Sequence, residues 1–362
     1  MPGGAAGPAG SLARGATTSV TVAGAVPAGA SMPGEDVYPN GRRIVAPAAI
    51  VSPGEQKDLA RAWAGAVRGE IWRREPLHRK IEYARRAGLG LPPDPDAVTT
   101  DLALEGIAGS PHLLPGNWLR RGADISDTVA LLETPAGDAT GFLVSDWLLM
   151  TNAHVLPSAE VAARSTARFR HQENAAGRIG RSRQHTLDPD RFFLAEPGLD
   201  YAVVAVAAHG RTGRGPGRTY GFVPLIGATG KILLGQPVNV VQHAGGRSRE
   251  IAVRDNRLLE LTGAHLVYAA GAAAGSSGAP IFNDRWELVA LHRRLVETRD
   301  AQGRLVDIDE HPVIGEPESP HRRWTAGQGV RVSAIVTDLG SRGLTAARQI
   351  LLTGLLTPGG SR

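Results

Sequence analysis

The spacing of hydrophobic residues changes along this chain: it is irregular over residues 1–50 and becomes helical after them. Residues 1–50 are rich in Gly, Ala and Pro and show little periodicity, which predicts a flexible, disordered tail. From 55 to 75, apolar side chains recur every four positions, the spacing of an amphipathic helix. They are Leu59, Trp63, Val67 and Ile71. Pro76 interrupts this helix, and residues 77–88 predict a second short helix that ends at Gly88.

From about residue 125 the apolar positions form short runs that are separated by turn residues. This pattern predicts many short strands, arranged as an antiparallel barrel or sandwich. The expected strands are 127–134, 140–145, 147–151, 201–208, 237–242, 249–253, 258–262, 265–270, 279–282 and 287–292. Two later segments, 332–340 and 344–354, predict helices that each end at a glycine. The sequence therefore predicts a mainly β chain with a helical N-terminal extension at 51–112 and a C-terminal helical segment at 332–354.

Composition narrows the classes of protein to consider. The 362 residues include no cysteine, which excludes disulfides, thiolate catalysis and Cys-ligated metal sites and fits a reducing cytoplasm. The net charge is +5, but acidic residues are interspersed with the basic ones and only 5% of residues are aromatic, so we expect no nucleic-acid partner. No apolar run reaches 18 residues, so we expect no membrane-spanning helix and no membrane partner. The N-terminal residues lack a clear signal peptide, which favours a cytoplasmic location over secretion.

The stretch GAAAGSSGAPIF, residues 271–282, carries two adjacent serines, Ser276 and Ser277, among small residues. A serine hydroxyl becomes a good nucleophile when a histidine removes its proton and a carboxylate orients that histidine. His154 follows an apolar strand in TNAHV, and Asp200 precedes the apolar strand 201–206. Each residue alone also fits a structural role, as a satisfied core histidine or a turn-capping aspartate. The chain order His, Asp, Ser is that of chymotrypsin, and the segment lacks the G-x-S-x-G elbow of α/β-hydrolases.

The segments TNAHV, LDYAVVAV and GSSGAPIF resemble the three catalytic blocks of trypsin-like (chymotrypsin-fold) serine peptidases, in particular bacterial glutamyl endopeptidases. The resemblance covers roughly 115–300. It implies a peptidase domain over 113–362, with two antiparallel β-barrels at about 125–210 and 218–300. It also implies an endopeptidase that acts on a protein or peptide substrate without a metal or cofactor.

The same resemblance implies a role for each site residue. Ser277 is the expected nucleophile, His154 the general base and Asp200 the residue that orients the base. The backbone N–H groups of Gly275 and Ser277 are expected to form the oxyanion hole, where a glycine allows a backbone conformation that few residues tolerate.

The expected specificity pocket gives a mixed signal. His292 stands fifteen residues after Ser277, and a histidine at that spacing recognises acidic side chains in glutamyl endopeptidases. That family usually has a hydroxyl residue five positions before the nucleophile, where this chain has Ala272. Gly271, six positions before, disfavours cleavage after Lys or Arg. A preference for acidic residues before the cleaved bond and a preference for small or apolar ones both stay open.

Other functions also stay open. The main alternative is a catalytically silent protease fold that serves as a binding or adaptor module. Another is an arginine-rich nucleic-acid binder that uses 1–90 and 210–219. The N-terminal helices could be a removed pro-segment, a partner-docking element or a part that packs on the barrel. Their apolar stripe favours packing.

Overall fold

The computed structural model contains a mainly β unit, Asp36–Arg362, to which every described residue belongs. It describes residues 49–67, 71–86, 88, 114–208, 213–253, 256–269, 276–298, 302, 304, 326–343 and 351. Most of the expected N-terminal tail lies outside these residues, as do Gly275, Ala272 and, apart from Leu351, the expected helix at 344–354.

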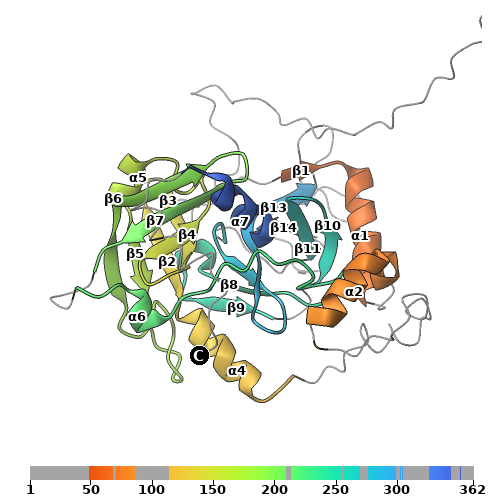
Figure 1. Ribbon diagram of the computed structural model, residues 1–362, viewed down its shortest axis with the longest axis horizontal. Coiled ribbons are helices and arrows are strands. Elements are labelled where there is room, and N and C mark those ends of the chain that lie inside the picture. Colours follow the sequence, from red (N-terminus) through yellow and green to blue (C-terminus); the bar gives the residue numbers. More distant parts are fainter. Residues whose placement is uncertain are drawn as a thin grey trace, which may run out of the picture. The chain divides into compact units, whose positions relative to one another are not determined.

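Six antiparallel strands form a closed barrel, in the order β2-β3-β4-β7-β6-β5 (Figure 1). They are β2 (Val129–Thr134), β3 (Gly137–Leu143), β4 (Leu148–Thr151), β5 (Thr166–Phe169), β6 (Arg183–Glu196) and β7 (Tyr201–Val206). The sequence predicts four of them. It misses β5 and β6: polar and charged residues separate the buried positions of β5, and in β6 the apolar residues 192–195 follow a largely polar stretch.

The remaining strands form a second sheet, in the order β10-β11-β14-β13-β12-β8-β9, with β1 paired to β13. They are β1 (Ala49–Val51), β8 (Asn239–Gln242), β9 (Glu250–Ala252), β10 (Leu258–Leu261), β11 (His265–Ala269), β12 (Pro280–Phe282), β13 (Leu288–Thr298) and β14 (Ala326–Arg331). The mainly β fold with two strand-built halves is confirmed. The second half differs in detail from the expected barrel, because over the described residues it is a curled sheet that does not close.

Strand β1 comes from a part of the chain that was expected to be mostly tail. It pairs in parallel with β13, with Ala49 opposite Val296 and Val51 opposite Thr298. The apolar triplet Ala-Ile-Val is too short to stand out in the sequence, but pairing with the edge of β13 satisfies its backbone hydrogen-bonding groups. The expectation of a flexible tail up to residue 50 is therefore wrong for its last two residues.

The N-terminal helices pack on the second sheet. They are α1 (Pro53–Val67), the 3₁₀ helix η1 (Ile71–Arg74) and α2 (Leu77–Arg86). Ala66 and Ile71 form a buried cluster with Leu259 of β10 and Ala269 of β11. Helix α2 is also tied to the β12–β13 turn, because Arg86 Nη2 donates to Glu287 Oε1 at 2.6 Å. The expected packing of these helices is observed at Ile71, whereas the side chains of Trp63 and Val67 lie outside the described set.

A shared hydrophobic core joins the barrel to the second sheet. It contains Phe142 and Tyr201 from the barrel, Phe282 and Val330 from the sheet, and Ile335 from α7 (Val332–Ser341). The expected helix at 332–340 is thus confirmed. The other helices are α4 (Asn117–Ser126), α5 (Ala159–Ala163), α6 (Gly217–Tyr220) and the 3₁₀ helix η4 (Ala244–Gly246).

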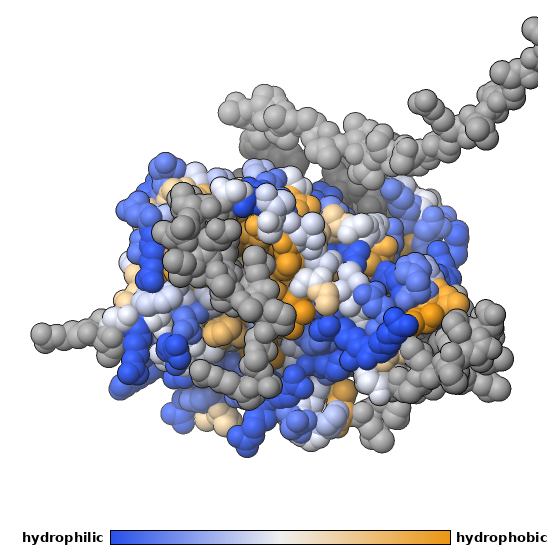
Figure 2. Space-filling model, in the orientation of Figure 1, coloured by the Kyte–Doolittle hydropathy of each residue, from blue (hydrophilic) through white to orange (hydrophobic). Residues whose placement is uncertain are grey.

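The surface is mostly polar on the face drawn in Figure 2, with hydrophobic side chains gathered near its middle. Among the described helices, none combines the length and the apolar character that a membrane crossing requires.

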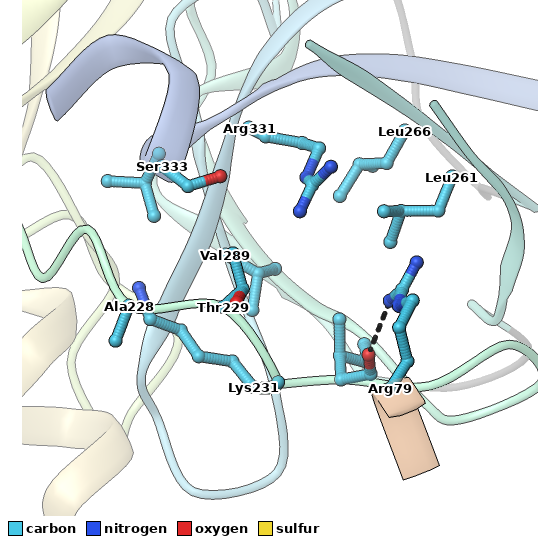
Figure 3. A pocket seen from close by; sticks show the side chains of 12 residues that line it. Arg79, Ala228, Thr229, Lys231, Leu261, Leu266, Val289, Arg331 and Ser333 are labelled. Atoms are coloured by element: carbon cyan, nitrogen blue, oxygen red, sulfur yellow. Dashed lines mark hydrogen bonds between the residues drawn. The ribbon is translucent and has the colours of Figure 1, made fainter. Parts of the chain in front are cut away.

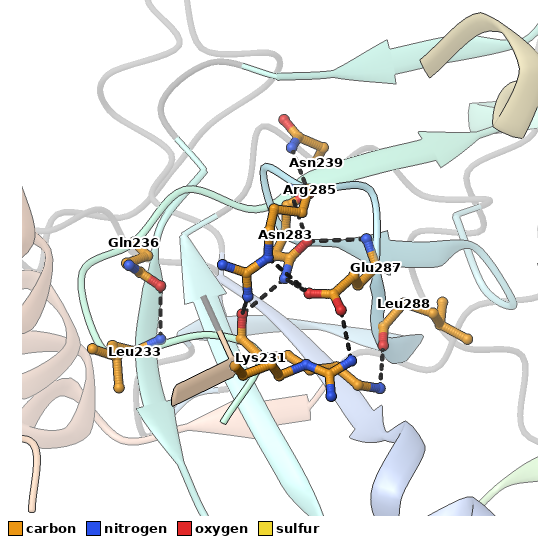
Figure 4. A network of polar contacts seen from close by, with 9 residues as sticks. Lys231, Leu233, Gln236, Asn239, Asn283, Arg285, Glu287 and Leu288 are labelled. Carbon is orange, nitrogen blue, oxygen red and sulfur yellow. Dashed lines mark hydrogen bonds and ion pairs between the residues drawn. The ribbon is translucent and has the colours of Figure 1, made fainter. Parts of the chain in front are cut away.

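A buried lysine anchors the segment before β8 to the second sheet (Figure 4). Lys231 is 5% exposed, and its Nζ donates to the backbone carbonyls of Leu288, at 2.9 Å, and Ile226. Its own carbonyl accepts from Asn283 Nδ2 at 2.8 Å. Burial, and to a smaller extent the positive charge of Arg86, lowers the pKa of Lys231 to about 7, against an opposing contribution from Glu287.

This lysine should make stability depend on pH above neutrality. An unfolded lysine has a pKa of about 10.4, so between pH 7 and 10 the unfolded chain binds more protons than the folded one. The free energy of unfolding should therefore rise with pH in this window, by up to about 1.4 kcal/mol per pH unit from this group. Urea unfolding at pH 6.5 and 9 would measure the rise. The Lys231→Met variant should lack it, and an equal rise in the variant would contradict the assignment.

Candidate active site

His154 and Asp200 form a hydrogen-bonded pair at the end of the barrel. His154 follows β4, and Asp200 directly precedes β7, the strand that pairs with β4. The His154 Nδ1 atom lies 3.0 Å from Asp200 Oδ1 and 2.9 Å from Oδ2. The backbone N–H of His154 also donates to Asp200 Oδ1 at 3.0 Å. The carboxylate thus fixes both the imidazole and the backbone that carries it.

The backbone of Asp200 has a conformation that is uncommon outside glycine. Its φ is 58°, in the left-handed region, which Asp and Asn tolerate better than most residues. Asn152 holds it there, because the Asn152 side-chain amide donates to the Asp200 carbonyl at 2.9 Å. Such strain persists only where the surroundings enforce it and is common at functional sites.

The charge of Asp200 is stabilised although the residue is buried. Burial by itself raises the pKa of the carboxyl group. The hydrogen bonds from His154 and the positive charge of Arg293 outweigh burial and lower this pKa below its ordinary value. Asp200 is therefore an ionised hydrogen-bond acceptor at neutral pH.

Ser277 lies in a tight turn that packs against the same end of the barrel. The backbone N–H of Thr140, on β3, donates to the Ser277 carbonyl at 2.9 Å. The next residue, Gly278, has a φ of +83°, and a Cβ atom there would collide with the Thr140 carbonyl oxygen and with Thr151 Oγ1. Only glycine fits this close approach. Because Thr151 ends β4, the turn lies beside the strand that leads to His154.

Two polar atoms at this place are buried and unpaired. Ser277 is fully buried, and neither Ser277 Oγ nor His154 Nε2 has a hydrogen-bond partner among the residues that the structure describes. Buried polar groups are nearly always hydrogen-bonded, so an unpaired one needs an explanation such as a catalytic role.

His292 lies beside this turn. Its carbonyl accepts from the Gly278 N–H at 3.0 Å, and its own N–H donates to the Ala279 carbonyl at 2.8 Å. The ring is buried, with Nδ1 2.8 Å from the Tyr268 hydroxyl. Burial, and to a smaller extent the charge of nearby His154, lowers the pKa of His292 to about 3, so the imidazole is neutral. The structure thus brings His154, Asp200, Ser277 and His292 to one region.

Sequence reasoning missed Arg293, the residue after His292. Its Nε donates to Asp200 Oδ2 at 3.0 Å, so the carboxylate has a second charged partner besides His154. The signal in the sequence is the pair Arg293-Arg294, two charged residues in the middle of a strand that is mostly apolar on both sides of them.

A pocket at a different place, between α2 and the second sheet, is open to solvent and has an empty volume of about 320 Å³, part of which is that solvent (Figure 3). Arg79 and Arg331 reach into it from opposite sides. Both are already engaged: Arg79 pairs with Glu75 at 2.8 Å, and Arg331 Nη1 donates to the Thr262 carbonyl at 2.7 Å. No residue of the His154 region lines this pocket, so we do not assign the chemistry to it.

Comparison with known families supports the fold. Residues 139–291 match the family model of the trypsin-like peptidase domain. The match spans the positions of His154, Asp200 and Ser277.

One curated relative matches most of this chain but only part of its own length. The chain is 32% identical over 292 residues to the uncharacterized protein y4fB of Sinorhizobium fredii (strain NBRC 101917 / NGR234). That alignment covers 74% of this chain but 42% of y4fB, so the chain spans about two fifths of the length of this curated relative.

Solved structures give low similarity scores. One is the inactive form of the Rv3671c protease, known from M. tuberculosis H37Rv, with a TM-score of 0.39, 17% identity, and coverage of 65% of this chain and 100% of that chain. Another is a Glu endopeptidase in complex with MPD, with a TM-score of 0.39, 13% identity, and coverage of 59% and 88%.

Proposed function

We propose that this protein is a serine endopeptidase in which Ser277, His154 and Asp200 form the catalytic triad. One observation carries the proposal: Asp200 holds His154 through Nδ1, while His154 Nε2 and Ser277 Oγ are both buried and have no hydrogen-bond partner among the described residues. A serine nucleophile and its general base require this division of roles between the two ring nitrogens.

The mechanism follows from these positions. Ser277 Oγ attacks the carbonyl carbon of the scissile peptide bond, and His154 Nε2 takes the hydroxyl proton. Asp200 keeps the second ring proton on Nδ1 and stabilises the imidazolium ion. The backbone N–H groups of Ser277 and Gly275 stabilise the tetrahedral oxyanion. His154 then protonates the leaving amine, and a water molecule hydrolyses the acyl-enzyme.

For specificity, we propose that His292 contributes to the pocket for the residue before the cleaved bond and favours Glu or Asp there. Its closeness to the Ser277 turn supports this role. A neutral imidazole would recognise the carboxylate as a hydrogen-bond donor rather than as a cation. A peptide library with all residues at that position would test the preference, and equal cleavage after Ala or Leu would contradict it.

A fluorophosphonate probe tests the main proposal, because such probes react covalently with activated serines. The full-length protein would be incubated with the probe and the labelled peptide mapped by mass spectrometry, with Ser277→Ala as the control. Label on Ser277 that is absent from Ser277→Ala is the expected result. A wild-type protein that stays unlabelled and cleaves no peptide would instead support the alternative of a silent binding module.

A further inference from the structure

A β-bulge in β13 directs Arg293 toward the His154–Asp200 pair. In the pairing of β13 with β14, His292 lies opposite Gly329 and Arg294 lies opposite Gln328. Two adjacent residues of β14 thus face two residues of β13 that are not adjacent, which leaves Arg293 as the extra residue. A bulge re-aims side chains and is frequent next to active sites.

Arg293 and His154 contact the same oxygen atom of the Asp200 carboxylate. Arg293 Nε donates to Asp200 Oδ2 at 3.0 Å, and the same oxygen lies 2.9 Å from His154 Nδ1. The Arg293 side chain is 22% exposed and that of Asp200 is 7% exposed, so solvent screens this ion pair only weakly. Nη1 of Arg293 also lies 3.5 Å from His265 Nε2, which limits the freedom of the guanidinium group.

We propose that Arg293 is a positioning residue of the peptidase site: it fixes the Asp200 carboxylate against His154 and offsets part of its negative charge. This inference rests on the proposed function. Hydrogen bonds to two partners hold the carboxylate in one orientation. The guanidinium charge also reduces the stabilisation that Asp200 gives to a protonated His154.

The neighbouring charged groups define the controls. The charge of Asp200 also acts on Arg294 and His265, whose pKa values it raises. Arg294 Nε donates to Gln328 Oε1 at 2.8 Å, away from the carboxylate. Burial lowers the pKa of His265, and the positive charge of Arg293 lowers it further. Arg294 is thus a half-buried arginine on the same strand that makes no hydrogen bond to Asp200 in the described structure.

The test compares Arg293→Gln, Arg293→Lys and Arg294→Gln with the wild type. The rate of fluorophosphonate labelling, or of peptide hydrolysis, would be measured from pH 4 to 9. In Arg293→Gln the acidic limb of the profile should move upward by about one pH unit, because an uncompensated Asp200 keeps His154 protonated longer. Arg293→Lys keeps the positive charge, so its acidic limb should lie close to the wild-type position. Arg294→Gln should leave the limb in place. A role in stability alone would lower the unfolding temperature without moving the limb.

A second readout separates this inference from the proposed function. NMR titration of the His154 ring protons follows its protonation without turnover, in the same variants. An upward move of the His154 midpoint in Arg293→Gln, but not in Arg294→Gln, would support the inference even if the wild type labelled no probe. Superimposable titrations of the wild type and Arg293→Gln would overturn it, whether or not the protein cleaves peptides.

Discussion

Replacement of Ser277 with alanine is expected to lower the turnover number by about 10⁶-fold, as removal of a triad nucleophile does in serine peptidases. The change removes Oγ, the atom that attacks the substrate, but no hydrogen bond within the described structure depends on it. The backbone contact between Ser277 and Thr140 stays, so the fold should be retained. Peptide turnover would measure the loss, and circular dichroism with thermal unfolding would check the fold.

The matched control is Ser276→Ala. Ser276 is also buried, and its carbonyl accepts from the Ala279 N–H, which a backbone-preserving change leaves intact. Turnover should fall by less than about tenfold, because Ser276 is not the nucleophile in this proposal. If Ser276→Ala were inactive and Ser277→Ala were active, Ser276 would be the nucleophile instead of Ser277.

Replacement of Asp200 with asparagine is expected to lower turnover by about 10⁴-fold while the overall structure stays the same. The carboxylate accepts from His154 Nδ1, whereas an asparagine amide can instead donate to it. The ring proton would then lie on Nε2, which could no longer take the proton of Ser277. Peptide turnover by the variant and the wild type at the same pH would measure the loss.

Asp188→Asn provides the control for this carboxylate. Asp188 lies on β6, and its Oδ1 accepts from the Arg191 N–H at 3.1 Å, in a local contact away from His154. Its replacement should leave turnover within about twofold of the wild type, since surface changes of this kind are mostly small. Full activity in Asp200→Asn would mean that another carboxylate orients the base.

Local patterns in the sequence are enough to predict most of the strands and to single out His154, Asp200 and Ser277 as candidate site residues. Apolar runs mark β2, β4 and β7, because these strands are buried along their whole or nearly whole length. The motifs around His154 and Asp200 stand at the ends of two such runs. Since β4 and β7 are neighbours in the barrel, the two side chains meet.

Long-range pairing and irregular backbone are what the sequence does not reveal. Strand β14 includes Gly327 and Gly329, residues with a low intrinsic tendency to form strands, and becomes a strand because β11 and β13 flank it. The bulge at Arg293 depends on register between β13 and β14, which no local pattern encodes. The contact of Arg293 with Asp200 can therefore be recognised only from the three-dimensional structure.

The pairing of β1 with β13 has a consequence for self-association. An uncovered strand edge presents a row of N–H and C=O groups with which another chain can pair, and this is a common start of aggregation. Strand β1 covers the edge of β13 at Val296–Thr298, just beyond the residues His292 and Arg293. Strand β1 thus protects β13, the strand beside the site, from pairing with a strand of another molecule. Shortened versions of the protein that begin after β1 would lose this protection.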